Sequence, residues 1–175
     1  MEPWQALSKQ DLLMNPLQEF FYQKENIEQI KSILDGNSLI SLRIIDWFVT
    51  NYSKKNNTSY LLPPLSNDEV AKQFIVYLNY KSQLKAYSKK QFDPFCRKNR
   101  IVFYYGPNET DSIKTTVGQL NFFRWAIKYK ILDYIQEHLT MIETDDEATE
   151  DESEEEDDSE IDILTNGMNH MELDS

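Results

Sequence analysis

The stretch RIVFYYGPNETDSIKTTVGQ, residues 100–119, decides the fold class. Two runs rich in β-branched and aromatic residues, at 100–105 and 112–117, flank the turn-forming segment GPNETD. This arrangement predicts a β-hairpin with GPNETD as its loop. Thr116 and Gln119 then have the spacing of a capping box, which starts a helix because each side chain satisfies a free backbone N–H group. A hairpin that leads directly into a helix indicates an α+β fold.

The other segments of the body are predicted to be helical. Apolar residues recur at near-helical spacing over 16–35, and Gly36 is a plausible stop. The segment 38–54 is apolar on almost every side, which indicates a buried central helix. Ser66 and Glu69 form another capping box after a proline-containing loop, so a further helix is expected to open there. The predicted helices span 16–35, 38–54, 67–90 and 116–139, which gives a mainly α fold with one β-hairpin.

Charge divides the chain into parts. Residues 143–175 contain 16 acidic residues and no Lys or Arg, whereas 1–142 contain the other 14 acidic residues and all 18 basic ones. The net charge of −12 therefore combines a body of +4 with a tail of −16. A like-charged segment with few apolar residues cannot offset the entropy cost of ordering. We expect an N-terminal arm at 1–15, a helical globular domain at 16–140 and a disordered acidic tail at 141–175.

Several functional classes are disfavoured by the composition. No apolar run is long enough to cross a membrane and no signal peptide is visible, so an intracellular location is expected. A structural zinc site needs four Cys or His ligands, and the chain offers only Cys96, His138 and His170. With four glycines in all, a Gly-rich phosphate loop is not expected. These observations predict no catalytic residues, no metal and no cofactor.

Cys96 is the single cysteine of the chain and stands in a cluster of positive charge. Nearby cations favour the reactive thiolate form, so one interpretation is a nucleophile that uses His138 as its base. The other interpretation is a small apolar side chain that packs beneath Phe92 and Phe95. The sequence favours packing, because no catalytic motif surrounds the cysteine.

The segment 76–105 carries the clearest functional pattern. Asp93 is its only acidic residue. Its basic residues are Lys81, Lys85, Lys89, Lys90, Arg97, Lys98 and Arg100. The interleaved aromatic residues are Tyr80, Tyr87, Phe92, Tyr104 and Tyr105. Because cations neutralise phosphates and aromatic rings stack on unpaired bases, all seven basic residues are predicted to bind nucleic acid, single- or double-stranded, or an acidic protein. The alternative is a solvated helix face above core aromatics.

The tail contains a second candidate contact. In the stretch DDSEIDIL the apolar residues Ile161, Ile163 and Leu164 follow a run of acids. This stretch resembles a SUMO-interacting segment, which adds as an edge strand to a partner sheet. The tail is therefore expected either to recruit a host or viral partner or to compete with phosphates for the cations of residues 76–105.

Three stretches together resemble a family of small proteins of nucleocytoplasmic large DNA viruses. They are SLRIIDWFVTNYSKKNN at 41–57, VYLNYKSQLKAYSKKQFDPFCRKNRIVFYY at 76–105 and TTVGQLNFFRWAI at 115–127. The resemblance covers roughly 16–137 and leaves the tail outside. It implies a viral protein that works in the cytoplasm or nucleus of an infected cell or is carried in the virion. It supplies no catalytic residue.

These observations lead to two functional hypotheses. The first is a non-enzymatic viral accessory protein whose basic body binds nucleic acid in replication, transcription or packaging, with the acidic tail tuning the contact. The second is a protein-interaction or virion structural module whose tail recruits a partner. Binding that falls steeply with salt is expected for the first, because counterion release dominates phosphate contacts.

Overall fold

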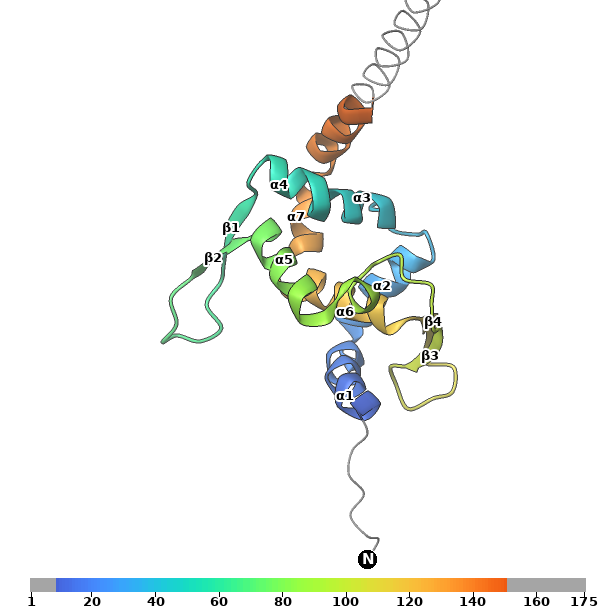
Figure 1. The fold of residues 1–175 in the computed structure, drawn as a ribbon. Helices are drawn as coiled ribbons and strands as arrows, with labels where there is room; N and C mark the ends of the chain where they lie inside the picture. Colours follow the sequence, from blue (N-terminus) through green and yellow to red (C-terminus); the bar gives the residue numbers. More distant parts are fainter. Residues whose placement is uncertain (1–8, 151–175) are drawn as a thin grey trace, which may run out of the picture. The chain divides into compact units, whose positions relative to one another are not determined.

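The computed structural model of the chain describes residues 9–150 (Figure 1). Over this range the protein contains helices and two separate antiparallel hairpins, which confirms the α+β class and corrects the prediction of a single hairpin. The helices are α1 (Lys9–Tyr22), α2 (Lys24–Leu34), α3 (Leu42–Trp47), α4 (Ser53–Lys55), α5 (Val76–Tyr87), α6 (Val117–Lys128) and α7 (Ile131–Glu137). The strands are β1 (Ser59–Leu62), β2 (Lys72–Ile75), β3 (Ile101–Tyr104) and β4 (Ser112–Thr115). All of them belong to one unit that ends at Glu137, and a second unit begins at His138.

The N-terminal helical region is divided into α1 and α2. The prediction of one helix over 16–35 was wrong, because Gln23 adopts an extended backbone with φ −71° and ψ 124°. Asn26 stabilises the break, since its Nδ2 donates a hydrogen bond of 2.9 Å to a carbonyl oxygen of α1. α1 begins at Lys9, so part of the predicted N-terminal arm is helical. α2 ends where the sequence predicted, with Gly36 at φ +75°, a conformation that glycine adopts without strain.

The predicted central helix over 38–54 is confirmed, with a later start. Ser41 is the N-cap of α3, because its hydroxyl accepts a hydrogen bond of 3.2 Å from the backbone N–H of Ile44. A π-helical turn, Phe48–Tyr52, connects α3 to α4 without a break in the helical path. Phe48 is fully buried, as expected for a helix at the centre of the unit.

The hairpin of β1 and β2 precedes α5 and was not predicted. Tyr60 lies opposite Phe74 in its register. The Ser66–Glu69 capping box does not start a helix; a backbone hydrogen bond of 3.2 Å between its ends closes a turn in the hairpin loop, and α5 begins only at Val76. Burial of Phe74, whose ring stacks on that of Tyr129 with centroids 5.0 Å apart, favours the strand. A contact with a distant residue therefore outweighs the local capping signal.

The hairpin of β3 and β4 confirms the prediction from residues 100–119. Ile101 pairs with Thr115, and the chain turns between the strands at the predicted loop. Phe103 is buried and meets Phe21 of α1 edge-on, with centroids 5.9 Å apart. Figure 1 shows that this hairpin and the β1–β2 hairpin extend from different parts of the helical unit.

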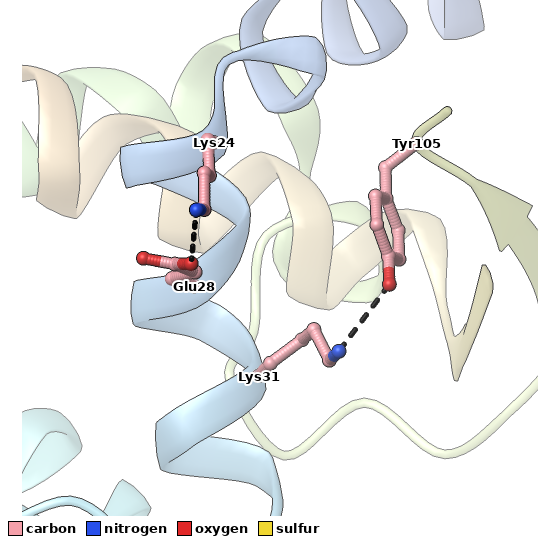
Figure 2. A network of polar contacts seen from close by, with 4 residues as sticks. All are labelled: Lys24, Glu28, Lys31 and Tyr105. Atoms are coloured by element: carbon pink, nitrogen blue, oxygen red, sulfur yellow. Dashed lines mark hydrogen bonds and ion pairs between the residues drawn. The ribbon is translucent and has the colours of Figure 1, made fainter. Parts of the chain in front are cut away.

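A polar contact ties the end of β3 to α2 (Figure 2). The Lys31 ammonium lies 3.2 Å from the hydroxyl of Tyr105, and this hydrogen bond raises the pKa of Lys31. On the same helix, Lys24 and Glu28 form an exposed ion pair at 3.8 Å. Both contacts lie at the surface and add little to stability. The Lys31–Tyr105 contact helps to orient the hairpin, whereas the Lys24–Glu28 pair lies within α2.

α6 runs through the core and starts where the sequence predicted. The Thr116 hydroxyl accepts a hydrogen bond of 3.2 Å from the backbone N–H of Gln119, which is the predicted N-cap. Its buried residues are Gly118, Leu120, Asn121, Phe122, Phe123, Trp125, Ala126 and Ile127. The helix was predicted to continue to residue 139 but breaks at Lys130, which has φ 61°. At the break the hydroxyl of Tyr60 donates to the free carbonyl of Tyr129, so a residue of β1 caps α6.

The second unit is helical over residues 139–150. Within it the Thr144 hydroxyl donates a hydrogen bond of 2.7 Å to the carbonyl of Thr140. The first part of the segment that the sequence assigned to a disordered tail is therefore a helix. Residues 151–175, which include the predicted partner contact Ile161, Ile163 and Leu164, lie outside the described residues. Over residues 9–150, none of the helices has the length and apolar character needed to span a bilayer.

Candidate nucleic-acid interface

The basic segment, residues 88–100, packs against the start of α6. A Cβ atom placed on Gly118 would lie 2.9 Å from the Cβ of Cys96 and 3.1 Å from the carbonyl oxygen of Lys90. Both distances are shorter than van der Waals contact, so only glycine allows this approach. The absence of a side chain at one position of α6 therefore sets how closely the basic segment lies against the core.

Side chains of α6 and its N-cap hold the backbone of the basic segment. Asn121 donates to the carbonyl of Gln91 at 2.9 Å, and Gln119 donates to that of Pro94 at 2.8 Å. The Thr116 hydroxyl donates to the carbonyl of Cys96 at 3.1 Å. Asn121 is itself buried, so its hydrogen bond satisfies a polar group inside the core. These three hydrogen bonds hold the backbone of the segment against α6 and its N-cap, so the exposed cations project from an ordered backbone.

Phe92 anchors the segment in the aromatic core. Its ring is buried, stacks on Tyr87 with centroids 6.0 Å apart and meets Trp125 edge-on at 5.4 Å. Tyr80 also packs against Phe92, with ring centroids 6.2 Å apart, and the indole N–H of Trp125 donates to Asn79 at 2.7 Å. Three of the aromatic residues expected among the cations therefore pack together: Phe92 is buried and cannot stack on a base, and Tyr80 and Tyr87 are half-buried against it.

All seven predicted cations are exposed. The structure places four of them around one surface hollow of about 450 Å³. The basic hollow, as we call it, is lined by Lys89, Lys90, Asp93, Phe95, Cys96, Arg97, Lys98 and Asn99. Within the described part of the chain, Lys90, Arg97 and Lys98 take part in no ion pair. Their charges are therefore exposed and are not neutralised by any carboxylate of residues 9–150.

The remaining predicted cations lie outside the basic hollow. Lys81 and Lys85 are on α5, and Arg100 lies just before β3. Lys81 shares the ring of Tyr77 with Lys54 of α4, each ammonium lying 5.6 Å from the ring centroid. Lys54 was not predicted as part of this surface, because no local pattern in the sequence reveals that α4 packs beside α5.

Phe95 was also missed by the pattern of interleaved aromatics. It is 40% exposed and lines the basic hollow directly beside the cations. Its backbone N–H donates to Oδ1 of Asp93 at 2.9 Å, and the N–H of Cys96 donates to the Asp93 carbonyl at 3.2 Å. This Asp-Pro turn was visible in the sequence, and it presents the ring at the surface.

Two carboxylates modify the local electrostatics. Burial raises the pKa of Asp46 on α3, the charge of Asp93 raises it further, and Lys89 opposes the shift. Burial and the same two carboxylates raise the pKa of Tyr80. Lys89 therefore acts on the Asp46 carboxylate, which leaves Lys90, Arg97 and Lys98 as the cations of the basic hollow best placed to meet an anion.

Cys96 packs rather than projecting into solvent. It is half-buried, its Cβ touches Gly118, and its Sγ lies 3.5 Å from the carbonyl oxygen of Lys90. The proposed base, His138, belongs to the second unit. Within residues 9–150, no three His, Cys, Asp or Glu side chains gather in a way that could hold a metal ion.

The fold and the basic hollow define a small α+β protein with a cation-lined surface site. The chain belongs to DUF7197, a family of unknown function, whose model matches residues 5–173. It is similar to uncharacterized protein L507 of Acanthamoeba polyphaga mimivirus, with 45% identity over 120 residues. The match covers 67% of this chain and 45% of that protein, so the chain spans less than half of its relative. No solved structure matches the chain.

The relative confirms the predicted family, but the family model extends to residue 173 and so includes the tail that the resemblance was expected to leave outside. Mimivirus is a giant virus, in agreement with the resemblance to proteins of nucleocytoplasmic large DNA viruses. The matching family has no assigned activity, so neither comparison supplies a functional residue.

Proposed function

We propose that the protein is a viral accessory protein that binds nucleic acid through the basic hollow and has no catalytic role. The observation that carries the proposal is the arrangement of Lys90, Arg97 and Lys98, which are exposed, unpaired within the described residues and held on an ordered backbone. Such cations release counterions when they meet phosphates, which supplies affinity without sequence specificity. Lys54, Lys81 and Lys85 extend the positive surface along α4 and α5.

The direct test is a salt series. Fluorescence anisotropy of labelled single- and double-stranded oligonucleotides with the full chain should show binding that weakens by orders of magnitude between about 50 and 200 mM salt. Binding that does not change with salt would contradict a phosphate-based contact. No binding at the lowest salt would remove nucleic acid as the ligand.

The acidic tail is proposed to modulate this binding. Residues 143–175 carry 16 acidic residues, and they compete with phosphates for the same cations. A chain that ends after Glu150 should therefore bind nucleic acid more tightly than the full chain at low salt, and the difference should shrink as salt rises. Equal affinities of the two chains would show that the tail has another role.

A second candidate function is supported by the loop of the β1–β2 hairpin. Leu65 and Val70 are 93% and 82% exposed and line a hollow of about 380 Å³ together with Lys72, Lys128 and Lys130. Apolar side chains beside lysines suit an acidic protein partner with apolar anchors. If this surface is the main binding surface, the complex with the protein partner should survive high salt. The double variant Leu65→Ser with Val70→Ser should then abolish that complex and leave nucleic-acid binding unchanged.

A further inference from the structure

Phe95 is an aromatic ring presented to solvent at the edge of the basic hollow. Among the described residues its ring takes part in no aromatic pair, whereas Tyr80 and Tyr87 both pair with buried Phe92. A single exposed apolar residue has no special meaning. Here, however, the Asp93 turn and buried Pro94 hold the backbone of Phe95, and its side chain lines the basic hollow together with the cations.

Phe95 and the residues around it offer contacts to both the phosphate and the base of a nucleotide. Lys90, Arg97 and Lys98 provide charge for a phosphate, and the Phe95 ring provides an apolar face for a base. The hollow, at about 450 Å³, lies within the range of roughly 300–1,000 Å³ that small-molecule sites occupy. Asn99, at φ 58°, turns the backbone at the rim and adds an amide that can hydrogen-bond to a base edge.

Stacking distinguishes an unpaired base from a paired one. In a duplex both faces of each base are already stacked, so a protein ring reaches a face only if the base leaves the helix. In a single strand, the face of a base becomes available for stacking at little cost in free energy. An exposed ring among cations is therefore useful for single strands and nearly useless for an undistorted duplex.

We propose that the basic hollow holds one unpaired nucleotide of a single-stranded nucleic acid, with its base stacked on Phe95 and its phosphates against Lys90, Arg97 and Lys98. This inference rests on the proposed function and adds the class of ligand. Cys96 is part of the floor and takes no chemical part in binding.

The test compares Phe95→Ala with Tyr22→Ala in the full chain. Tyr22 is also an exposed aromatic residue, at 69%, but it lies on α1 and outside the basic hollow. Phe95→Ala should weaken binding of single-stranded oligothymidine and oligouridine by roughly tenfold, the effect of losing one stacked base, and leave the salt slope and duplex binding unchanged. Phe95→Trp should restore the affinity, and Tyr22→Ala should have no effect. The DNA and RNA arms establish which strand is preferred.

The outcomes separate the two proposals. If the wild-type chain binds with a steep salt slope and Phe95→Ala binds single strands equally well, the stacking inference is wrong and the phosphate contact stands. If the wild-type chain binds neither strand form, the proposed function and the inference fail together. A direct check avoids any folding defect of the variants: ultraviolet crosslinking of the wild-type chain to bromodeoxyuridine-substituted single strands should label the peptide that contains Phe95. Crosslinks confined to other peptides would overturn the inference.

Discussion

At the residue scale, the close approach between Gly118 and the basic segment is the feature most sensitive to change. A methyl group at this position would lie 2.9 Å from the Cβ of Cys96 and 3.1 Å from a carbonyl oxygen, and neither atom can rotate away. Gly118→Ala should therefore lower the free energy of unfolding by about 1–3 kcal/mol, the usual cost of overpacking, as measured by urea denaturation.

Cys96 supplies the control for this prediction. Cys96→Gly removes the atoms that the new methyl group meets first, so the double variant with Gly118→Ala should lose less stability than the two single changes together. Additive losses would show that the two residues do not constrain each other. The same result would also remove the explanation for why glycine is required on α6.

The charge of Asp46 is a second residue-scale feature. Burial and Asp93 raise its pKa above the ordinary value of 3.8, so the folded protein binds a proton more readily than the unfolded chain does. The free energy of unfolding therefore falls as the pH rises from 3.8 through the raised pKa, and above that pKa it falls no further on account of Asp46. Asp46→Asn should stabilise the protein at neutral pH, by less than about 1 kcal/mol because the group is partly exposed, and should flatten this part of the pH profile.

The matched control for Asp46 is Asp35→Asn, which changes an exposed carboxylate at the end of α2. Thermal unfolding across a pH series would compare the two variants with the wild-type chain. If Asp46→Asn destabilises the protein at neutral pH, the carboxylate makes a favourable contact and the account of its burial is wrong.

At the element scale, the start of α6 links the fold to the site. Thr116 caps the helix and also holds the basic segment through the carbonyl of Cys96. Thr116→Ala should cost about 1–2 kcal/mol of stability, because both hydrogen bonds are lost. Thr116→Ser keeps the hydroxyl and should retain most of that stability. Equal losses in the two variants would show that the methyl group, and not the hydroxyl, is what matters.

The same element shows what could be predicted from the sequence. Residues 100–119 specify the β3–β4 hairpin and the N-cap through local turn and capping chemistry, and both were predicted correctly. The break after α6 has no such local cause. Lys130 adopts φ 61° without being Gly or Asn, and the capping group is the hydroxyl of Tyr60, far away along the chain. A single sequence contains no sign of that contact.

The β1–β2 hairpin was missed for a related reason. Ser66–Glu69 satisfies the local rule for a helix start, yet stacking of Phe74 on Tyr129 selects a strand. Within the site, the four cations of the basic hollow were predicted individually, because charge is visible in the sequence. Their gathering around Phe95 depends on the contacts between the basic segment and α6. The placing of Lys81 beside Lys54 depends on the packing of α4 against α5.

At the scale of the whole molecule, the proposed binding of nucleic acid depends on the distribution of charge. The basic segment contains five basic residues and one acidic residue, so its net charge equals the +4 of the whole body, and α6 holds its backbone. A cation that contacts phosphate contributes to the salt slope, whereas a cation elsewhere contributes little. The position of a substituted cation, and not the total charge of the protein, should therefore determine how much the binding of nucleic acid changes.

The measurement that tests this claim most directly compares two triple variants with equal charge. One is Lys90→Gln with Arg97→Gln and Lys98→Gln in the basic hollow; the other is Lys24→Gln with Lys72→Gln and Lys114→Gln, all exposed and outside it. Anisotropy across a salt series should show that the first variant loses affinity and that its slope falls by about 2–3, at roughly 0.7–0.9 per phosphate contact. The second variant should keep a slope close to that of the wild-type chain. Equal losses in both variants would contradict a localised interface and leave only a diffuse attraction between opposite charges.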